Sequence, residues 1–187
     1  MDGFLIALLL VFALALGGRE QWLMAQWASA RGPRVSLLAA GVACSAGSAT
    51  AMAWAGSELA ALLPGRAAQM LVALALGFAA VELAWPVRQS LPREPTRSLG
   101  AFAIVLLVRQ LGDGARFAVF ALAAWAHLPL AAGLGGALGG AGAVAMGWAL
   151  GTSGLARLPL RTVRMALGAA LLVAALFIGL NARFAVI

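Results

Sequence analysis

The sequence has no lysine and no tyrosine, and it has one cysteine, one histidine and only six acidic residues in 187 positions. With Cys44 alone, a disulfide scaffold and a cysteine-rich zinc site are both excluded. His127 has no second histidine or cysteine to act with, so a histidine proton relay and a Cys–His catalytic pair are excluded as well. No Walker loop and no Rossmann glycine motif is present. We therefore expect a protein that is not an enzyme and that has no resident cofactor.

Charge is scarce and apolar residues are abundant. Charged residues make up 10% of the chain, hydrophobic residues make up 64%, and the mean hydropathy is +0.99. A soluble domain is about one quarter charged and roughly half apolar. The net charge of +7 comes from thirteen arginines that are dispersed in short gaps. This pattern indicates a polytopic membrane protein in contact with the lipid bilayer, and it excludes a nucleic-acid-binding surface.

Six apolar stretches are long enough to cross a bilayer, because a spanning helix needs about 20 apolar residues. Short gaps that contain proline and arginine separate them. The stretches are roughly 3–29, 35–56, 66–86, 98–126, 129–150 and 160–182. We therefore predict an all-α membrane protein with six transmembrane helices, in which residues 1–187 form a single transmembrane domain.

The arginines are distributed unequally between the two sides of these spans. Two lie on one side, Arg66 and Arg183, and eight lie on the other: Arg31, Arg34, Arg88, Arg93, Arg97, Arg157, Arg161 and Arg164. Because cytoplasmic loops carry the excess of basic residues, we expect both termini to face away from the cytoplasm. The first apolar run lacks a preceding basic residue, which favours an uncleaved helix over a signal peptide. Abundant alanine without lysine or tyrosine is typical of a GC-rich bacterial genome, so we expect a bacterial inner membrane.

The chain also repeats a set of less common residues at an offset of about 95 positions. Leu16-Gly17 matches Leu111-Gly112, and Pro64-x-Arg66-x-x-x-Met70 matches Pro159-x-Arg161-x-x-x-Met165. Each repeat would hold three helices, an odd number, so the two halves would have opposite orientations in the membrane. This is the inverted-repeat plan of many secondary transporters, in which the site forms where the halves meet. We predict repeat one at about 1–90 and repeat two at about 96–187.

Two equivalent places in these repeats carry charge deep within apolar sequence. Ionisable groups inside a membrane are costly, and they usually face the bundle interior and mark a functional or paired site. The glycines beside them would let each helix loosen and free backbone carbonyls as ligands. The first place contains Gly17, Gly18, Arg19, Glu20 and Gln21, and the second contains Arg109, Gln110, Gly112, Asp113, Gly114 and Arg116.

The layout and these motifs resemble the Gdt-one family of membrane cation transporters, which includes Golgi manganese/calcium–proton exchangers and bacterial manganese exporters. That family has six helices in two repeats, each with the motif Glu-x-Gly-Asp-Lys/Arg-Ser/Thr on its first helix. The segment from Gln110 to Ala115 retains the glycine and the aspartate, with glutamine in place of the leading glutamate. The segment from Ala15 to Glu20 retains a glycine and a basic residue, and both of its acidic positions are replaced.

The resemblance implies an antiporter that exchanges manganese or calcium for protons by alternating access. On this interpretation Asp113 and Glu20 alternately hold the metal and protons, and Gln110 and Gln21 add neutral oxygen ligands. The metal would be transported cargo.

The charge of the two motifs supports other interpretations. Glu20 and Asp113 stand against Arg19, Arg109 and Arg116, a net charge of +1 that would repel a divalent cation. On a regular helix, Arg109 and Arg116 would both be within pairing distance of Asp113. The alternatives are therefore a structural ion-pair cluster in a non-transporting scaffold or partner-binding subunit, and an anion site. The sequence is compatible with a homo-oligomer and also with a complex with another membrane protein.

We predict structural roles for three polar residues outside the motifs. We expect Glu82, near the end of the third span, to reach toward the membrane interface. We expect Ser45 and Ser48 to allow close helix packing.

Overall fold

The computed structural model describes residues 2–87, 98–126 and 129–184, and its secondary structure there consists of eight α-helices. The predicted all-α class is thus confirmed. In chain order the helices are α1 (Asp2–Ala15), α2 (Arg19–Arg31), α3 (Val35–Ala61), α4 (Gly65–Ala84), α5 (Leu99–Leu111), α6 (Gly114–Ala126), α7 (Pro129–Leu155) and α8 (Leu160–Phe184).

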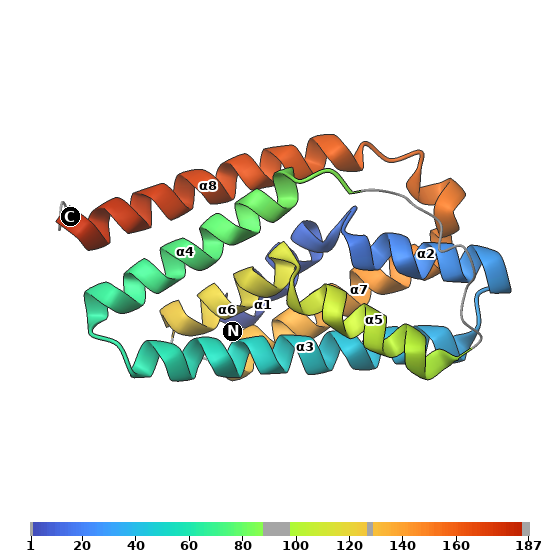
Figure 1. Cartoon of the computed structure of the whole chain (residues 1–187), viewed down its shortest axis with the longest axis horizontal. Helices are drawn as coiled ribbons and strands as arrows, with labels where there is room; N and C mark the ends of the chain where they lie inside the picture. Colours follow the sequence, from blue (N-terminus) through green and yellow to red (C-terminus); the bar gives the residue numbers. More distant parts are fainter. Residues whose placement is uncertain (1, 88–97, 127–128, 185–187) are drawn as a thin grey trace.

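The helices run roughly along the long axis of the molecule (Figure 1). Helix α7 packs against α1, α2 and α3, and α8 packs along α4. Helices α3 and α7 run in opposite directions, as do α4 and α8 (Figure 1). Helix α6 contacts α1, α3, α4 and α7, so the second half of the chain is inserted among the helices of the first half.

Two of the predicted spans are broken helices. The span predicted at 3–29 is divided into α1 and α2, which meet at an angle of 65°. Gly17, at this bend, has a φ of +71°, a backbone conformation that favours glycine. The span predicted at 98–126 is divided into α5 and α6 at Gly112 and Asp113. Both breaks therefore fall within the glycine-containing motifs that carry the charged residues.

Helices α3, α4, α7 and α8 are long and apolar enough to cross a membrane, and α1 with α2 makes a fifth candidate if the bent pair counts as one span. Helices α5 and α6 are apolar, but each has 13 residues, fewer than the roughly 20 that span a bilayer. Among the described residues, length and composition thus give four or five candidate spans, where the sequence predicted six. Their number and hydropathy indicate an integral membrane protein.

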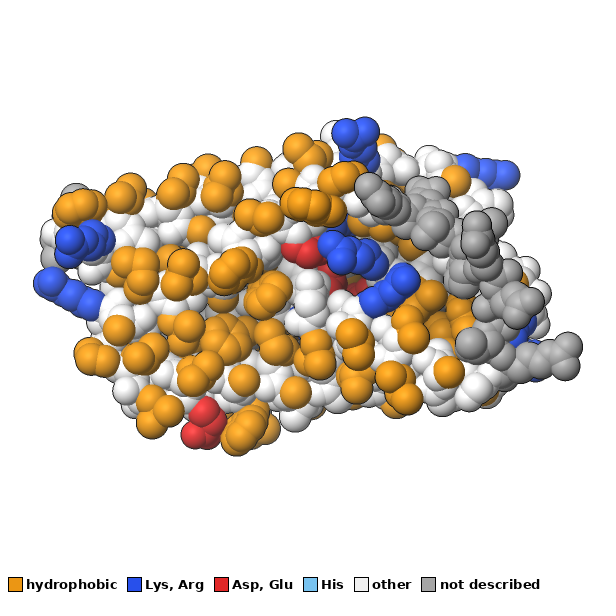
Figure 2. Space-filling view, in the orientation of Figure 1, with side chains coloured by type: hydrophobic (Ala, Val, Ile, Leu, Met, Phe, Trp, Pro, Cys, Tyr) orange, Lys and Arg blue, Asp and Glu red, His pale blue; other side chains and the backbone are white. Residues whose placement is uncertain are grey.

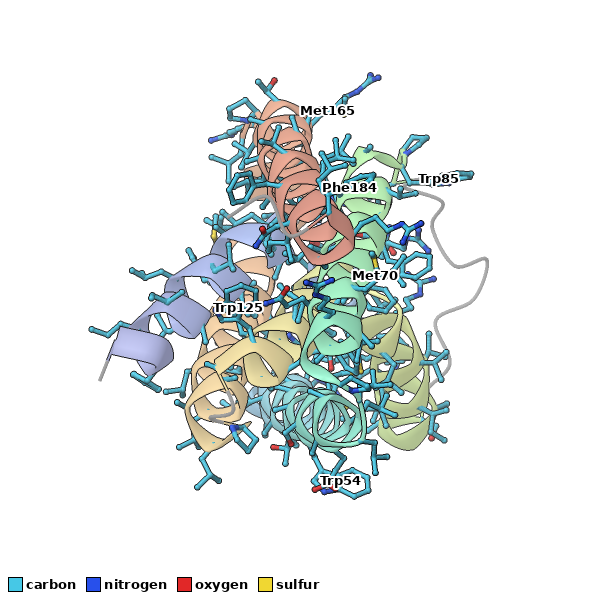
Figure 3. The ribbon with its side chains drawn as sticks, turned by 90° about the vertical axis from the view of Figure 1, so that its left-hand side faces the viewer. Trp54, Met70, Trp85, Trp125, Met165 and Phe184 are labelled. Carbon is cyan, nitrogen blue, oxygen red and sulfur yellow. The ribbon has the colours of Figure 1, made fainter. Side chains whose placement is uncertain are left out.

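The outer surface is apolar, as contact with lipid tails requires. Hydrophobic side chains cover most of the face in Figure 2, and arginines lie near the ends and at a central recess. Trp54 and Trp85 are more than 60% exposed and project away from the helices (Figure 3). Large exposed side chains such as Phe78, Leu130 and Val173 continue this surface on α4, α7 and α8.

Inside, small residues allow the helices to approach closely. A Cβ atom at Gly139 of α7 would stand 2.5 Å from the Leu8 carbonyl oxygen and 2.9 Å from the Phe12 nitrogen of α1. A Cβ at Gly135, one turn earlier, would meet the Phe4 carbonyl oxygen. Helix α1 therefore lies directly on a glycine stripe of α7, and this contact fixes the position of the first broken helix.

We predict that Gly139→Ala lowers the free energy of unfolding by about 1–3 kcal/mol, because the added methyl group would force α1 away from α7. Thermal unfolding of the purified protein in detergent measures this change. Gly47→Ala on α3 is the matched control, because a Cβ there would meet nothing within 4 Å. Equal melting temperatures for the two variants would contradict the close crossing of α1 and α7.

Candidate functional site

Polar side chains gather in the interior where the two helix breaks meet. We call this group the buried polar cluster, and each of its members is at most 9% exposed. Helices α2, α3, α4, α5, α6 and α8 contribute to it. Its members are Glu20, Ser45, Ser48, Glu82, Gln110, Asp113, Arg116 and Arg164.

Arg116, in the first turn of α6, is fully buried and is held by α3. Its Nε donates to Ser48 Oγ at 2.7 Å, and its Nη2 donates to Ser45 Oγ at 2.8 Å. A Cβ at Gly140 of α7 would stand 2.6 Å from Arg116 Nη2, so only glycine leaves room for the guanidinium there. The two serines, expected only to allow close packing, therefore also serve as acceptors for a buried arginine.

Glu20 lies in the first turn of α2, where the positive end of the helix dipole favours a carboxylate. Its Oε2 lies 4.0 Å from Arg116 Nη2, and neither of its oxygens accepts a hydrogen bond from the described residues. Gln110 Oε1 accepts from Ser48 Oγ at 3.0 Å. Glu20, Gln110, Arg116 and the serines thus link the two broken helices through α3.

Asp113 lies in the break between α5 and α6 and is 3% exposed. Both of its carboxylate oxygens lack a hydrogen-bond partner, and within the described ranges it forms no ion pair within 4 Å. The charges of Glu20, Glu82, Arg116 and Arg164 act on it through space. Asp113 is therefore a buried carboxylate that the surrounding side chains leave unpaired.

Arg109 does not join the cluster. The expected contact with Asp113 assumes a regular helix, but the chain leaves the helix at Gly112 before it reaches Asp113. Arg109 is consequently exposed and lines a groove together with Arg19. Arg19 is also exposed, although its Nε approaches Glu82 Oε1 at 3.7 Å.

Glu82 belongs to this cluster, whereas the sequence placed it at the membrane interface. It lies near the end of α4 and is only 9% exposed. Its Oε2 accepts from the Gly114 N–H at 3.3 Å and lies 3.2 Å from Arg164 Nη2. Glu82 therefore caps the start of α6 and joins it to α8. In the sequence, the signal for this role is an acidic residue that follows a long apolar run. The partner of Glu82, Arg164, lies 82 residues further along the chain, so local sequence does not pair the two.

Gln21 stabilises the first helix break. Its Oε1 accepts from the Gly17 N–H at 2.7 Å, and its Nε2 donates to the Ala143 carbonyl oxygen at 3.1 Å. Gln110 Oε1 is likewise engaged by Ser48. Both amide oxygens that were predicted as ligands already have partners in this arrangement, so the free acceptors in the cluster belong to Glu20 and Asp113.

The charge of the buried groups is negative. Three carboxylates, Glu20, Glu82 and Asp113, face two buried guanidinium groups, Arg116 and Arg164, which leaves one negative charge in excess. The sum of +1 expected from the motifs becomes −1 because Arg109 and Arg19 lie outside the buried group, whereas Glu82 and Arg164 lie inside it. An excess of negative charge in a low-dielectric interior attracts a cation or a proton.

The acidic groups do not form a preassembled metal cage. Among the residues that the structure describes, no three histidine, cysteine or acidic side chains are close enough to hold one metal ion together. A divalent cation at Asp113 would therefore have to keep several of its water ligands.

Two cavities lie beside the cluster. A groove lined by Arg19, Trp22 and Arg109 has a volume of about 480 Å³. A neighbouring cavity of about 560 Å³ is lined by Gly17, Arg161 and Arg164. Figure 2 shows acidic side chains within a recess between arginines on this face.

We predict that Arg116→Gln lowers the free energy of unfolding by about 3–5 kcal/mol, because it leaves Glu20 buried without its cation. The double variant Glu20→Gln/Arg116→Gln should recover much of this loss, since no uncompensated charge then remains at this pair. Melting temperatures in detergent measure both effects, with Arg66→Gln at an exposed position as the control. Strictly additive losses would contradict the coupling of Glu20 to Arg116.

Comparisons with protein families, with curated protein sequences and with solved structures gave no match to this chain. The functional interpretation therefore rests on the residues of the chain and on their arrangement.

Proposed function

We propose that this integral membrane protein is a cation transporter that exchanges a divalent cation, manganese or calcium, for protons by alternating access. The proposal follows the resemblance of its motifs to the Gdt-one family. The observation that carries it is Asp113, a carboxylate that is buried at a helix break with both oxygens unpaired.

A buried, unpaired carboxylate costs several kcal/mol unless it binds a proton or a cation. Among the described residues, Asp113 has no protein donor to offset this cost. The charges of Glu20, Glu82, Arg116 and Arg164 sum to zero, so the one negative charge in excess is that of Asp113 itself. Protonation and cation binding would each neutralise that charge, and each would prevent the other. Mutual exclusion at one carboxylate is the simplest physical basis for exchange.

The proposal includes six spans arranged as two inverted three-helix repeats. A broken helix, a 27-residue helix and a further long helix follow one another twice, first as α1/α2, α3 and α4, then as α5/α6, α7 and α8. If each broken pair crosses the membrane once, the number of spans is six. The opposite directions of α3 and α7 support the inversion (Figure 1). The broken helices would then meet near the midplane, where such transporters bind their substrates.

Glu20 would be the second cation-binding group on this proposal. It lies on the other broken helix, and its oxygens also accept no hydrogen bond from the part of the chain that the structure describes. Arg116 lies 4.0 Å away and partly compensates its charge, so Asp113 would bind the cation more strongly than Glu20 does. Alternating movement of the two broken helices would change which side of the membrane reaches these groups.

A non-transporting scaffold is the second candidate. The contacts of Arg164 with Glu82 and of Arg116 with the two serines favour it, because they tie four helices together without any ligand. On this interpretation the cluster sets helix positions, and Asp113 is kept neutral by a permanently bound proton.

The two candidates predict different fluxes. In proteoliposomes that contain a pH-sensitive dye, external Mn²⁺ or Ca²⁺ should drive protons outward through the transporter, and Asp113→Asn should abolish this movement. Glu58→Gln, which removes an exposed carboxylate from α3, is the control and should retain the flux. A folded protein that moves neither metal nor protons would contradict the proposal and favour the scaffold.

A further inference from the structure

Arg19 and Arg109 bring two like charges to one groove. Arg19 is the first residue of α2, and Arg109 lies in the last turn of α5. Both line the groove of about 480 Å³, and the charge of Arg19 acts on Arg109 through space. Two guanidinium groups that line the same space repel each other unless an anion lies between them. The pair therefore favours a negatively charged ligand.

The described part of the chain supplies little negative charge to this groove. Glu82 lies 3.7 Å from Arg19 Nε, but the same carboxylate also contacts Arg164 and the Gly114 N–H. Arg109 forms no ion pair within 4 Å with any described residue. Among the described residues, none that lines the groove is acidic. The guanidinium group of Arg109 is thus left to bind an anion from outside the protein.

One face of α2 forms a wall of the groove. The residues of α2 that line it occupy positions i, i+3, i+4 and i+7, and they are Arg19, Trp22, Leu23 and Gln26. Seven residues of α-helix extend about 10 Å, so the arginines and Gln26 lie toward opposite ends of this wall. Trp85, which follows α4, also lines the groove and projects away from the helices (Figure 3).

Gln26 is a second and independent indication of a ligand. It is only 9% exposed, and it lines the groove. Its side-chain amide forms no hydrogen bond with the residues that the structure describes. A buried amide without a partner is unfavourable, and a polar ligand in the groove would remove that cost. The groove therefore has a cationic end and a neutral, hydrogen-bonding end.

We propose that this groove binds a hydroxylated phosphate ester, with the phosphate group between Arg19 and Arg109 and the hydroxyl groups at Gln26. The proposal goes beyond cation exchange and does not depend on it. Guanidinium groups donate paired hydrogen bonds to phosphate oxygens, and an amide both donates to and accepts from hydroxyl groups. The volume of about 480 Å³ is within the range of about 300–1,000 Å³ that is usual for sites of small organic ligands.

The same chemistry has two sources. A water-soluble ester such as glycerol 3-phosphate carries it, and so does the headgroup of an anionic phospholipid such as phosphatidylglycerol. Exposed Trp85 beside the groove is compatible with both, because an indole ring packs against lipid tails and against the carbon atoms of a soluble ligand.

Calorimetric titration of the purified protein in phosphate-free detergent solution tests the cationic end. We expect Arg109→Gln to weaken the binding of inorganic phosphate and of glycerol 3-phosphate about 10- to 100-fold, as the loss of a charge-assisted contact requires. Arg109 is exposed, so this variant should keep the fold, which circular dichroism verifies. Arg161→Gln is the matched control, because it removes the same charge from the neighbouring cavity, and it should leave both affinities unchanged.

Gln26→Leu tests the neutral end. The unmodified protein should bind glycerol 3-phosphate more tightly than inorganic phosphate, because only the ester reaches Gln26. In Gln26→Leu this difference should disappear, while the affinity for inorganic phosphate stays the same. A merely structural role of Gln26 would change both affinities together or neither of them, and either result would contradict the proposed position of the hydroxyl groups.

Nanodiscs of phosphatidylglycerol and of phosphatidylcholine distinguish the two sources. If the headgroup is the ligand, glycerol 3-phosphate should bind more weakly in phosphatidylglycerol, and native mass spectrometry should show phosphatidylglycerol retained by the unmodified protein and lost from Arg109→Gln. If the soluble ester is the ligand, its affinity should be equal in the two nanodiscs.

Three results would overturn the proposal. Binding that Arg109→Gln leaves unchanged would do so, as would binding that Arg161→Gln abolishes. A folded protein that binds no glycerol 3-phosphate in detergent and retains no phosphatidylglycerol would also contradict it. None of these results bears on cation exchange, which Asp113→Asn tests separately.

Discussion

The interior of this protein is organised by the need to bury charged groups inside an apolar helical bundle. Three carboxylates and two guanidinium groups are removed from solvent in a chain that has only six acidic residues. Such groups persist only where partners offset their desolvation. Serines on α3 and a glycine on α7 supply these conditions for Arg116, and Glu82 supplies them for Arg164. Asp113 is the exception, and the functional argument follows from it.

Small residues make this burial geometrically feasible. Gly139 lets α1 approach α7, Gly140 accommodates Arg116, and Gly18 places no side chain beside Arg164 and Asp113. These glycines therefore do more than tighten the packing, because they also determine where charged side chains have room. The break between α5 and α6 also determines which charged groups meet. It removes Arg109 from the cluster and leaves Asp113 without the partner that a regular helix would provide.

Much of the fold could be predicted from local sequence, whereas the site could be predicted only in part. Long apolar runs and glycine-containing motifs are local signals, and they indicated the helices and the positions where two helices break. The partners of the charged residues depend on contacts between distant segments. Glu82 and Arg164 were therefore assigned to the membrane interface and to a cytoplasmic gap, although they form an ion pair inside the bundle. The sign of the charge sum was wrong for the same reason.

The central claim is that Asp113 is an exchangeable cation-binding group, and binding of Mn²⁺ to the purified protein tests it most directly. Electron paramagnetic resonance of Mn²⁺ titrated into the detergent-solubilised protein distinguishes free from bound metal. The account predicts saturable binding that weakens as the pH falls and that is absent in Asp113→Asn. Binding that is unchanged in Asp113→Asn, or no binding to a folded protein at any pH, would contradict it.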